Sequence, residues 1–463
     1  MDSFAFPIDC ILVEKAGRVI TEEYNFPYHA DKMHRMFSIA KSYTSLAVGA
    51  LICEGKLKLA DHIVDYFPDY FFAHTEDESY ANLRNMTIRD MLMMRTCFAQ
   101  TTYKKNPKEN WIESFFYTVP DHKPGMIFQY DTSAALVLAA LVNRISGKTV
   151  LDYLREVFLD AIGFSKDAYF MKDPFGADDG GSGMMAYPTD LLLTGRFLLA
   201  AYNGKLKEKY PQIVSGRENR VYDEAFFQKY EEYIKEAMSY HSSTVHNGKT
   251  RSEKAGYGYM FWMLPEGGSM MYGMGGQYLL IDPKQDLIAV TCADAQSEGG
   301  GTQQILDYVE RTFFHEKETG NADLRNGMLQ NKTLRDTELI HKKAEIGDYF
   351  GEYRTKGAAS FITGFVLDEN ELCIRTTEGE YCFSYSDDDF SSPETVRDNL
   401  CCCGKATLQP DGSLYLCERL TGESVGMLHI VICKKEEAVL YLRKVAEYVL
   451  PQFNGFFDAR CIS

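Results

Sequence analysis

The chain has 463 residues, of which 45% are hydrophobic and 25% charged, a composition typical of a globular protein with room for two or three domains. Its 49 lysines and arginines against 66 aspartates and glutamates give a formal net charge of -17. Such a surface repels the phosphates of nucleic acids and anionic membranes, so neither is expected as a partner. The N-terminal residues lack the features of a signal peptide, and no run approaches the about 18 apolar residues of a membrane span.

The first 316 residues predict helices segregated around an antiparallel sheet. A β-hairpin is predicted from two apolar runs, 10–13 and 18–24, that flank Gly17. A long apolar helix is predicted from Ser38 to the natural stop at Gly55. Further helices are predicted at 87–94 (with a Thr87–Asp90 capping box), 111–117, 133–145, 150–161, 189–202 and 301–314, and a charged surface helix at 223–238. Strands are predicted at 257–264, 272–281 and 287–292, the last two joined by a turn at 282–286.

The rest of the chain changes character twice. Residues 317–343 are polar and without aromatic residues, which predicts a linker. Residues 344–463 predict a separate β-rich domain, a small antiparallel sheet or barrel. Its strands are predicted at 361–366, 371–376, 380–385, 406–409, 413–418 and 428–434. This domain has no catalytic signature; capping a pocket, dimerisation and partner binding are all open to it.

Twelve cysteines show no disulfide-like framework, which favours reduced structural thiols and a cytoplasmic location. The run Cys401-Cys402-Cys403 lacks the spacing of zinc ligands and has no histidine nearby. No metal or organic cofactor is therefore predicted.

Ser38 and Lys41 begin the first long helix, where residues three apart share a face. A serine hydroxyl becomes a good nucleophile when a neighbouring base takes its proton, and burial can keep a lysine neutral enough to do so. The helix N-terminus favours the negative charge that then develops. The alternative is structural: Ser38 as a helix cap and Lys41 as a solvated side chain.

Two further segments occur in a telling order. Residues 129–132 (Gln-Tyr-Asp-Thr) follow a Pro-Gly turn and precede an apolar helix, and residues 272–277 (Tyr-Gly-Met-Gly-Gly-Gln) open a predicted strand. Together with the Ser-x-x-Lys motif they resemble the serine β-lactamase family, which includes class C β-lactamases, penicillin-binding proteins, esterases, amide hydrolases and D-aminopeptidases. The resemblance spans about residues 8–315 and includes segments 54–61, 87–92 and 180–190. It implies a β-lactamase/transpeptidase-like α/β (α+β type) domain.

The resemblance also implies catalytic roles. Ser38 would attack an acyl carbon and carry the acyl group, while Lys41 and Tyr130 share the proton transfers. Which of these two is the general base stays open. The oxyanion would be bound by the backbone N–H groups of Ser38 and Gln277. Outside the resemblance, Tyr130 would be read as a core tyrosine, and the pair Gly275-Gly276 as a β-bulge or a tight bend.

The expected substrate-binding positions depart from the family pattern. Met274 stands where a lysine or histidine usually binds a substrate carboxylate, and Thr132 stands where an asparagine usually binds an acylamide. Gly275 and Gly276 would leave room for a substrate along the strand edge. Losing both polar anchors disfavours penicillins and D-alanyl peptides.

We therefore predict a serine hydrolase that cleaves a small-molecule ester or amide through an acyl-serine intermediate. The alternatives are an acyltransferase with the same acyl-enzyme, a D-peptide or β-lactam hydrolase, and a non-catalytic sensor. The intact set of Ser38, Lys41 and Tyr130 argues against the sensor.

Overall fold

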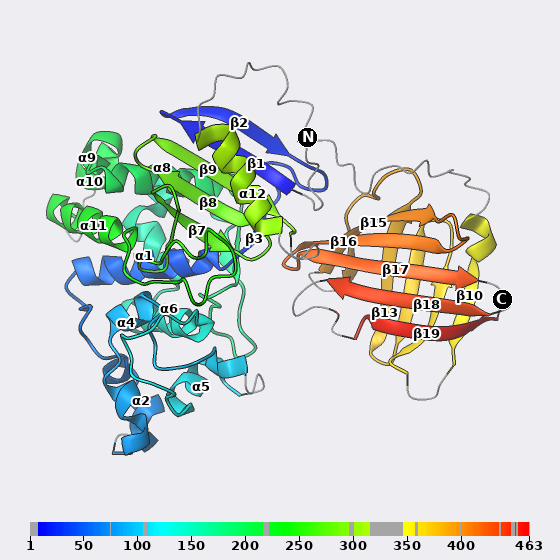
Figure 1. Ribbon diagram of the computed structural model, residues 1–463, viewed down its shortest axis with the longest axis horizontal. Helices are drawn as coiled ribbons and strands as arrows, with labels where there is room; N and C mark the ends of the chain where they lie inside the picture. The colour runs from blue at the N-terminus through cyan, green and yellow to red at the C-terminus, as the bar shows by residue number, and fades with distance from the viewer. Residues whose placement is uncertain are drawn as a thin grey trace.

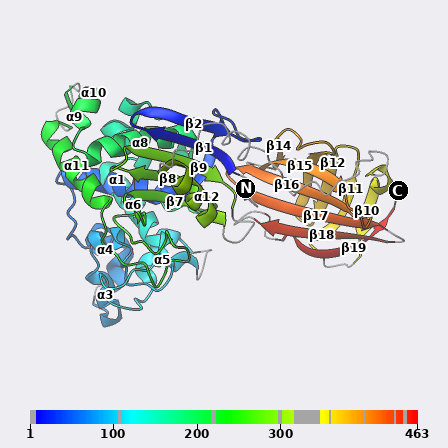
Figure 2. The same ribbon diagram turned by 45° about the horizontal axis from the view of Figure 1, so that its top comes forward.

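The computed structural model describes residues 8–74, 76–104, 109–215, 222–295, 301–314, 346–356, 360–397, 400–434, 437–445, 450 and 452–462. Two bodies lie side by side, an N-terminal domain of helices and strands and a C-terminal β domain (Figure 1 and, turned by 45°, Figure 2). Each has its own buried apolar cluster, one drawn from residues 8–314 and the other from 346–459. The predicted linker 317–343 lies outside the described residues, and the domain boundaries stay a prediction.

The N-terminal domain contains a six-stranded antiparallel sheet in the order β2-β1-β9-β8-β7-β6. Its strands are β1 (Ile8–Lys15), β2 (Arg18–Tyr24), β6 (Trp262–Met263), β7 (Ser269–Gly273), β8 (Gln277–Asp282) and β9 (Leu287–Ala293). The predicted β1–β2 and β8–β9 hairpins are confirmed. The predicted single strand 272–281 is wrong, because Gly275 (φ 89°) and Gly276 (φ 104°) reverse the chain between β7 and β8. The predicted strand 257–264 is also too long, since only β6 is regular.

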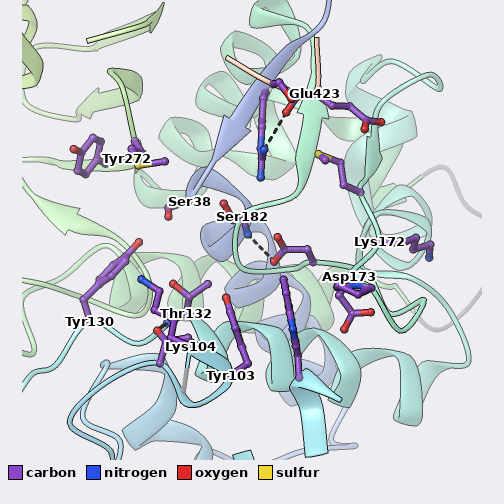
Figure 3. A pocket seen from close by; sticks show the side chains of 18 of the residues that line it. Ser38, Tyr103, Lys104, Tyr130, Thr132, Lys172, Asp173, Ser182, Tyr272 and Glu423 are labelled. Atoms are coloured by element: carbon purple, nitrogen blue, oxygen red, sulfur yellow. Dashed lines mark hydrogen bonds between the residues drawn. The ribbon is translucent and has the colours of Figure 1, made fainter. Parts of the chain in front are cut away.

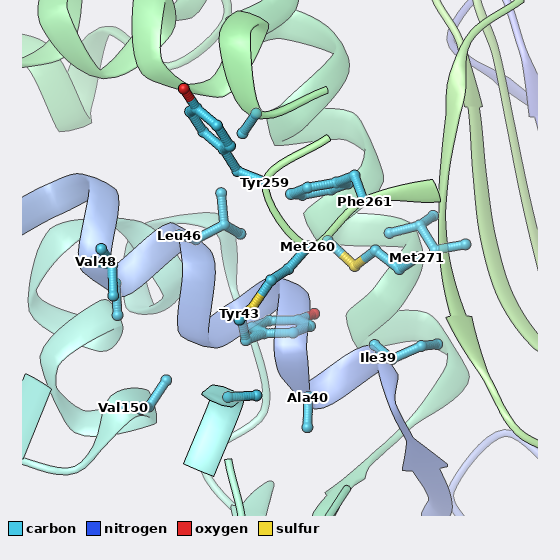
Figure 4. Packing of buried hydrophobic residues seen from close by; sticks show 14 of the residues in the cluster. Ile39, Ala40, Tyr43, Leu46, Val48, Val150, Tyr259, Met260, Phe261 and Met271 are labelled. Carbon is cyan, nitrogen blue, oxygen red and sulfur yellow. The ribbon is translucent and has the colours of Figure 1, made fainter. Parts of the chain in front are cut away.

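Helix α1 (Ile39–Cys53) confirms the predicted first helix and is buried along nearly its whole length. Figure 4 shows apolar side chains from several segments around it, including Met260 and Phe261. Helix α11 (Glu224–Ala237) was expected as a surface helix but packs on α1. Gly49 permits this contact, since a Cβ there would lie 2.1 Å from a ring carbon of Tyr233. The amphipathic pattern was read correctly; its apolar face covers the core helix.

The other helices predicted for this domain are present, whereas four short ones, α2, α3, α9 and α10 (Pro68–Phe71, Ala81–Arg84, Leu206–Lys209 and Pro211–Ser215), were not predicted. The capping box at α4 (Ile88–Leu92) is present, with Asp90 N 3.2 Å from Thr87 Oγ1 and Thr87 N 3.0 Å from an Asp90 carboxylate oxygen. The longer helices are α5 (Trp111–Tyr117), α6 (Thr132–Ser146), α8 (Pro188–Tyr202) and α12 (Gly301–Val309), and α7 (Val150–Leu154) is shorter. A small sheet, β3-β5-β4, joins His34–Phe37, Met184–Ala186 and Tyr169–Phe170.

The C-terminal domain is a ten-stranded sheet in the order β13-β12-β11-β10-β19-β18-β17-β16-β15-β14, and a parallel β13–β15 pairing closes it into a barrel. Its strands are β10 (Gly351–Thr355), β11 (Ile362–Leu367), β12 (Glu371–Thr376), β13 (Gly379–Ser386), β14 (Glu394–Arg397), β15 (Leu400–Leu408), β16 (Leu414–Gly422), β17 (Gly426–Lys434), β18 (Ala438–Val445) and β19 (Asn454–Cys461). All six predicted strands are present. The sequence pattern missed β10, β14, β18 and β19.

Cys373 and Cys382 form a disulfide between β12 and β13. The strand register sets these two residues directly opposite each other, a relation that cysteine spacing alone does not reveal. The prediction that all thiols are reduced is therefore wrong for this pair. The cytoplasmic location stays a prediction.

Within the described ranges, no single helix has both the length and the apolarity to span a membrane. Thr132–Ser146 and Val150–Ile162 meet those criteria only as a pair, and the pair is bent by 59°.

Candidate active site

Ser38 lies at the junction of β3 and α1. Phe37 just before it has a left-handed backbone (φ 47°), an uncommon conformation for a residue with a side chain and one that often marks functional sites. Ser38 occupies the N-cap position of α1, but its side chain makes no capping hydrogen bond. The hydroxyl is instead 3.0 Å from Lys41 Nζ. The structural reading of Ser38 as a side-chain cap is therefore wrong.

Lys41 is buried, with 1% of its surface exposed, so the reading of a solvated lysine is also wrong. Its Nζ donates to the carbonyl oxygen of Gly181 at 2.6 Å, which aims the amine at Ser38. Burial lowers the pKa of Lys41 to about 7, while the charges of Asp179 and Asp131 oppose the shift. A large fraction of the amine is therefore neutral near pH 7 and able to accept a proton.

Tyr130 completes the predicted group. Lys41 Nζ lies 4.9 Å from the centre of its ring, and the Ser38 side chain is close enough to affect the pKa of the phenol. Burial raises the pKa of Tyr130 well above its usual value, and the nearby Ser38 side chain only partly offsets this. The structure thus brings Ser38, Lys41 and Tyr130 together, with the amine titrating near neutrality and the phenol protonated there.

The turn that positions Lys41 was only partly anticipated. Asp179 is half-buried, and its Oδ1 accepts from the backbone N–H groups of Gly181 (3.2 Å) and Ser182 (3.0 Å). This holds the Gly181 carbonyl against the amine. The sequence showed this segment as a glycine turn, but it gave no sign that a carbonyl from it would contact Lys41.

The predicted binding residues separate into two groups. Thr132, the first residue of α6, and Met274 line the pocket. Gln277 is fully buried, and its side-chain amide donates to the carbonyl oxygens of Met274 and Ala293, both at 2.8 Å. Gly276 is close to α12, since a Cβ there would lie 2.5 Å from Ile305 Cδ1. Close packing against α12 is thus a further reason for a glycine at this position, and the substrate-binding roles predicted for Gly275 and Gly276 remain predictions.

The pocket has a volume of about 1050 Å³ and is shared by both domains (Figure 3). Ser38, Tyr130 and Thr132 lie on the N-terminal side with the aromatic residues Tyr103, Trp111, Trp262 and Tyr272. The barrel contributes Glu378, Tyr381, Arg397, Leu400, Glu423, Ser424 and Leu450. Of the three roles that the sequence left open for this domain, the structure shows it walling the pocket. The alternation of hydrophobic residues predicts strands, but it does not predict which of them will lie against another domain.

Buried polar contacts fix the barrel to the strand that precedes Ser38. Arg419 of β16 forms an ion pair with Asp9 and donates to the Phe26 carbonyl oxygen at 2.8 Å. Asp9 is also 2.9 Å from His34 Nε2 on β3, and all three side chains are buried. Arg35, the next residue of β3, donates to the carbonyl oxygen of Glu423 at 2.9 Å.

Comparison with known proteins agrees with this geometry. The Beta-lactamase family model matches residues 9–308. The 6-aminohexanoate-dimer hydrolase of Paenarthrobacter ureafaciens is 23% identical over 301 residues, which cover 61% of this chain and 71% of that protein.

Two solved structures are also similar. The octameric penicillin-binding protein homologue from Pyrococcus abyssi has a TM-score of 0.47 and 16% identity, with 98% of this chain and 96% of that chain covered. The D-amino acid amidase from Ochrobactrum anthropi SV3 has a TM-score of 0.47 and 14% identity, with coverage of 65% and 92%. Because the family model matches well over half of the chain, the protein belongs to the β-lactamase family and is a serine hydrolase.

Proposed function

We propose that this protein hydrolyses a small-molecule amide or ester through an acyl-enzyme formed on Ser38. The observation that carries the proposal is the 3.0 Å contact between Ser38 Oγ and a buried Lys41 amine whose pKa is about 7. A nucleophile and a base matched to neutral pH lie together beside a pocket large enough for a small molecule.

In the proposed first step, neutral Lys41 takes the Ser38 proton as the oxygen attacks the carbonyl carbon. Protonated Tyr130 then donates to the departing nitrogen or oxygen and regains a proton from Lys41. Water enters along the reverse route and releases the acid from Ser38. The raised pKa of Tyr130 favours this division of labour, because a phenol held protonated is a poor base at the start of the cycle.

For the oxyanion we propose the backbone N–H groups of Ser38 and Met274. Met274 lines the pocket with Ser38, whereas Gln277 is fully buried with its side chain committed to the β7–β8 turn. A donor must face the developing charge to stabilise it, and a pocket-lining residue is the better candidate for that position.

The substrate class follows from the pocket and from the relatives. Met274 and Thr132 both line the pocket. Their departure from the family's usual residues can therefore weaken the binding of β-lactams and D-peptides there. The similar protein from Paenarthrobacter ureafaciens is a 6-aminohexanoate-dimer hydrolase, and such a dimer is joined by an amide bond. We therefore favour a small amide, with esters as the more reactive alternative.

The test is covalent labelling with a fluorophosphonate, followed by intact mass spectrometry. Wild type should gain one adduct and Ser38→Ala none. Ser182→Ala is the matched control, since Ser182 lines the same pocket and should still permit labelling. An adduct that persists in Ser38→Ala would disprove the nucleophile. Product analysis with added alcohols or amines then separates hydrolysis from acyl transfer.

A further inference from the structure

Most charged side chains of the pocket already have partners. Glu253 accepts from the backbone N–H of Lys249 at 2.7 Å, and Glu423 accepts from Tyr169 Oη at 2.7 Å. Among the cations, Lys172 pairs with Asp178 at 2.5 Å, and Arg397 donates to Tyr381 Oη at 3.0 Å. These contacts tie each of the four side chains to a neighbouring residue.

Lys104 differs from them. It lines the pocket, is exposed, and has no ion pair or hydrogen bond from its amine to any residue that the structure describes. Lys249 is the other pocket-lining lysine whose amine has no such partner among the described residues. The two unmatched cations therefore give the pocket a capacity for an anion that its paired residues do not use.

Local structure brings Lys104 to the catalytic end of the pocket. It closes the short 3₁₀ turn Thr102–Lys104, whose neighbouring residues are bonded to the start of α6. Thr132 N donates to Thr101 Oγ1 at 3.1 Å, and Thr102 N donates to Ser133 Oγ at 3.3 Å. Figure 3 shows Lys104 on the same side of the pocket as Thr132 and Tyr130.

Electrostatics give independent support for this closeness. The charge of Lys104 is one of those that act on Lys41, where it lowers the pKa, and Asp179 and Asp131 act in the opposite direction. Lys249 is not among the charges that act on Lys41. Of the two unmatched lysines, Lys104 is thus the one whose charge reaches the reacting group.

An aromatic wall lies beside it. The rings of Tyr103 and Trp111 stack with centroids 4.2 Å apart and planes 7° from parallel, and both residues line the pocket. Such a face suits a short chain of methylene groups. A substrate that extends along it from Ser38 would present its far end near Lys104.

We propose that Lys104 binds a substrate carboxylate, so that the preferred substrate is an amide or ester whose acyl chain ends in a carboxylate. Lys104 would supply, from the α6 side, the positive charge that Met274 cannot supply from the β7–β8 turn. One ammonium group suits a monoanion, whereas a phosphate dianion is usually bound by several donors or an arginine fork. This inference rests on the proposed hydrolysis at Ser38.

The test compares two p-nitrophenyl esters of similar length, the monoester of glutaric acid and the butanoate, in wild type, Lys104→Met and Lys249→Met. Lys104→Met should raise KM about tenfold for the glutarate ester and leave KM for the butanoate within about twofold. Lys104→Arg should restore much of the loss. Added salt should raise KM for the glutarate ester in wild type but not in Lys104→Met, because the ion pair is screened.

A second readout needs no charged substrate. With the butanoate, Lys104→Met should move the acid limb of kcat/KM to higher pH, since it removes a charge that lowers the pKa of Lys41. Lys249→Met should leave that limb unchanged.

The outcomes separate the two proposals. Hydrolysis of neither ester, or hydrolysis that survives Ser38→Ala, would overturn the proposed function. Ser38-dependent hydrolysis of both esters with equal KM effects in Lys104→Met would overturn the anchor alone. Loss of the glutarate preference in Lys249→Met, with Lys104→Met unaffected, would also overturn it.

Discussion

Lys41 in the N-terminal domain and Glu418 in the barrel are both buried ionisable side chains, but their burial has different consequences. Lys41 in the N-terminal domain has two polar contacts, to Ser38 and Gly181, and burial lowers its pKa to about 7. Glu418 in the barrel lies on β16 between the core residues Leu416 and Leu420, so it faces inward. Its oxygens have no hydrogen-bond partner in the described part of the chain apart from the weakly donating Cys402 thiol beside it, and burial raises its pKa to about 8.

Burial therefore shifts the pKa of both groups toward neutral pH, yet only Lys41 lies where it can exchange a proton with a reacting atom. Lys41 is next to a nucleophile that lines a pocket, whereas Glu418 lies in a closed apolar core. A perturbed pKa marks a functional site only where the group can reach a reacting atom. Four experiments test or refine this contrast.

The largest effect is expected on turnover. Lys41→Met should lower kcat about a thousandfold, because the serine then lacks its base while the apolar replacement suits the buried position. Glu418→Leu should leave kcat within about twofold. Steady-state kinetics with an uncharged ester measures both, and a large loss in Glu418→Leu would remove the distinction between the domains.

Another buried charge, that of Arg419, joins the two domains. Arg419→Ala leaves Asp9 buried without its cation, which should cost about 3–5 kcal/mol in the free energy of unfolding. Both tryptophans of the chain, Trp111 and Trp262, line the pocket, so their emission should shift to longer wavelength if the barrel wall moves away.

Lys32→Met is the control for that experiment. Lys32 also contacts β16, but only through a 3.5 Å bond to Thr421, and its loss should change the free energy of unfolding by less than about 0.5 kcal/mol. Equal urea midpoints for the two variants would show that the buried ion pair does not hold the domains together.

The pH profile of wild type should follow Lys41. Protonation below its pKa removes the base, so kcat/KM for an uncharged ester should fall about tenfold per pH unit below a midpoint near 7. At pH 5 about one hundredth of the plateau should remain. The midpoint should be the same in Glu418→Leu, and a flat profile down to pH 5 would rule out Lys41 as the titrating base.

The smallest expected effect concerns the free energy of unfolding, on which the titrations of Glu418 and Lys41 act with opposite dependence on pH. The pKa of Glu418 is higher in the folded state, so stability should fall as pH rises from about 4.5 to about 8. The pKa of Lys41 is lower in the folded state, so its contribution should rise between about pH 7 and 10.5. Glu418→Leu should stabilise the barrel by about 1–3 kcal/mol at pH 8 and by less at pH 5. Calorimetry of both proteins at the two pH values provides the measurement, and a gain that is independent of pH would contradict the raised pKa.

The N-terminal domain was the more predictable of the two. Its helices are long and periodic, and Ser38, Lys41 and Tyr130 lie in motifs whose order is informative in itself. The errors there came from local backbone geometry: two left-handed glycines divide a run that reads as one strand, and Gly49 admits Tyr233 so that a charged helix covers the core.

The barrel and the far side of the pocket were less accessible to sequence reasoning. Strand β14 is short and mostly exposed, so it lacks the alternation that marks a half-buried strand. The Cys373–Cys382 pairing depends on register, and the contacts of Arg419 and Glu423 depend on how two separate domains dock. None of these is a local property of the chain. The contact between the Gly181 carbonyl and Lys41 could not be predicted either, because every residue has a backbone carbonyl and the sequence does not mark which one will be used.

The closed barrel has a practical consequence for protein engineering. Its first and last strands, β10 and β19, pair with each other, so the domain's hydrogen-bonded framework is complete within itself. Substrate selectivity could thus be evolved by randomising the pocket-lining barrel residues Glu378, Tyr381 and Arg397. The Ser38 hydroxyl and the Lys41 amine of the N-terminal domain would be left unchanged. Libraries built there would sample new ligand shapes while the chemical step keeps its native surroundings.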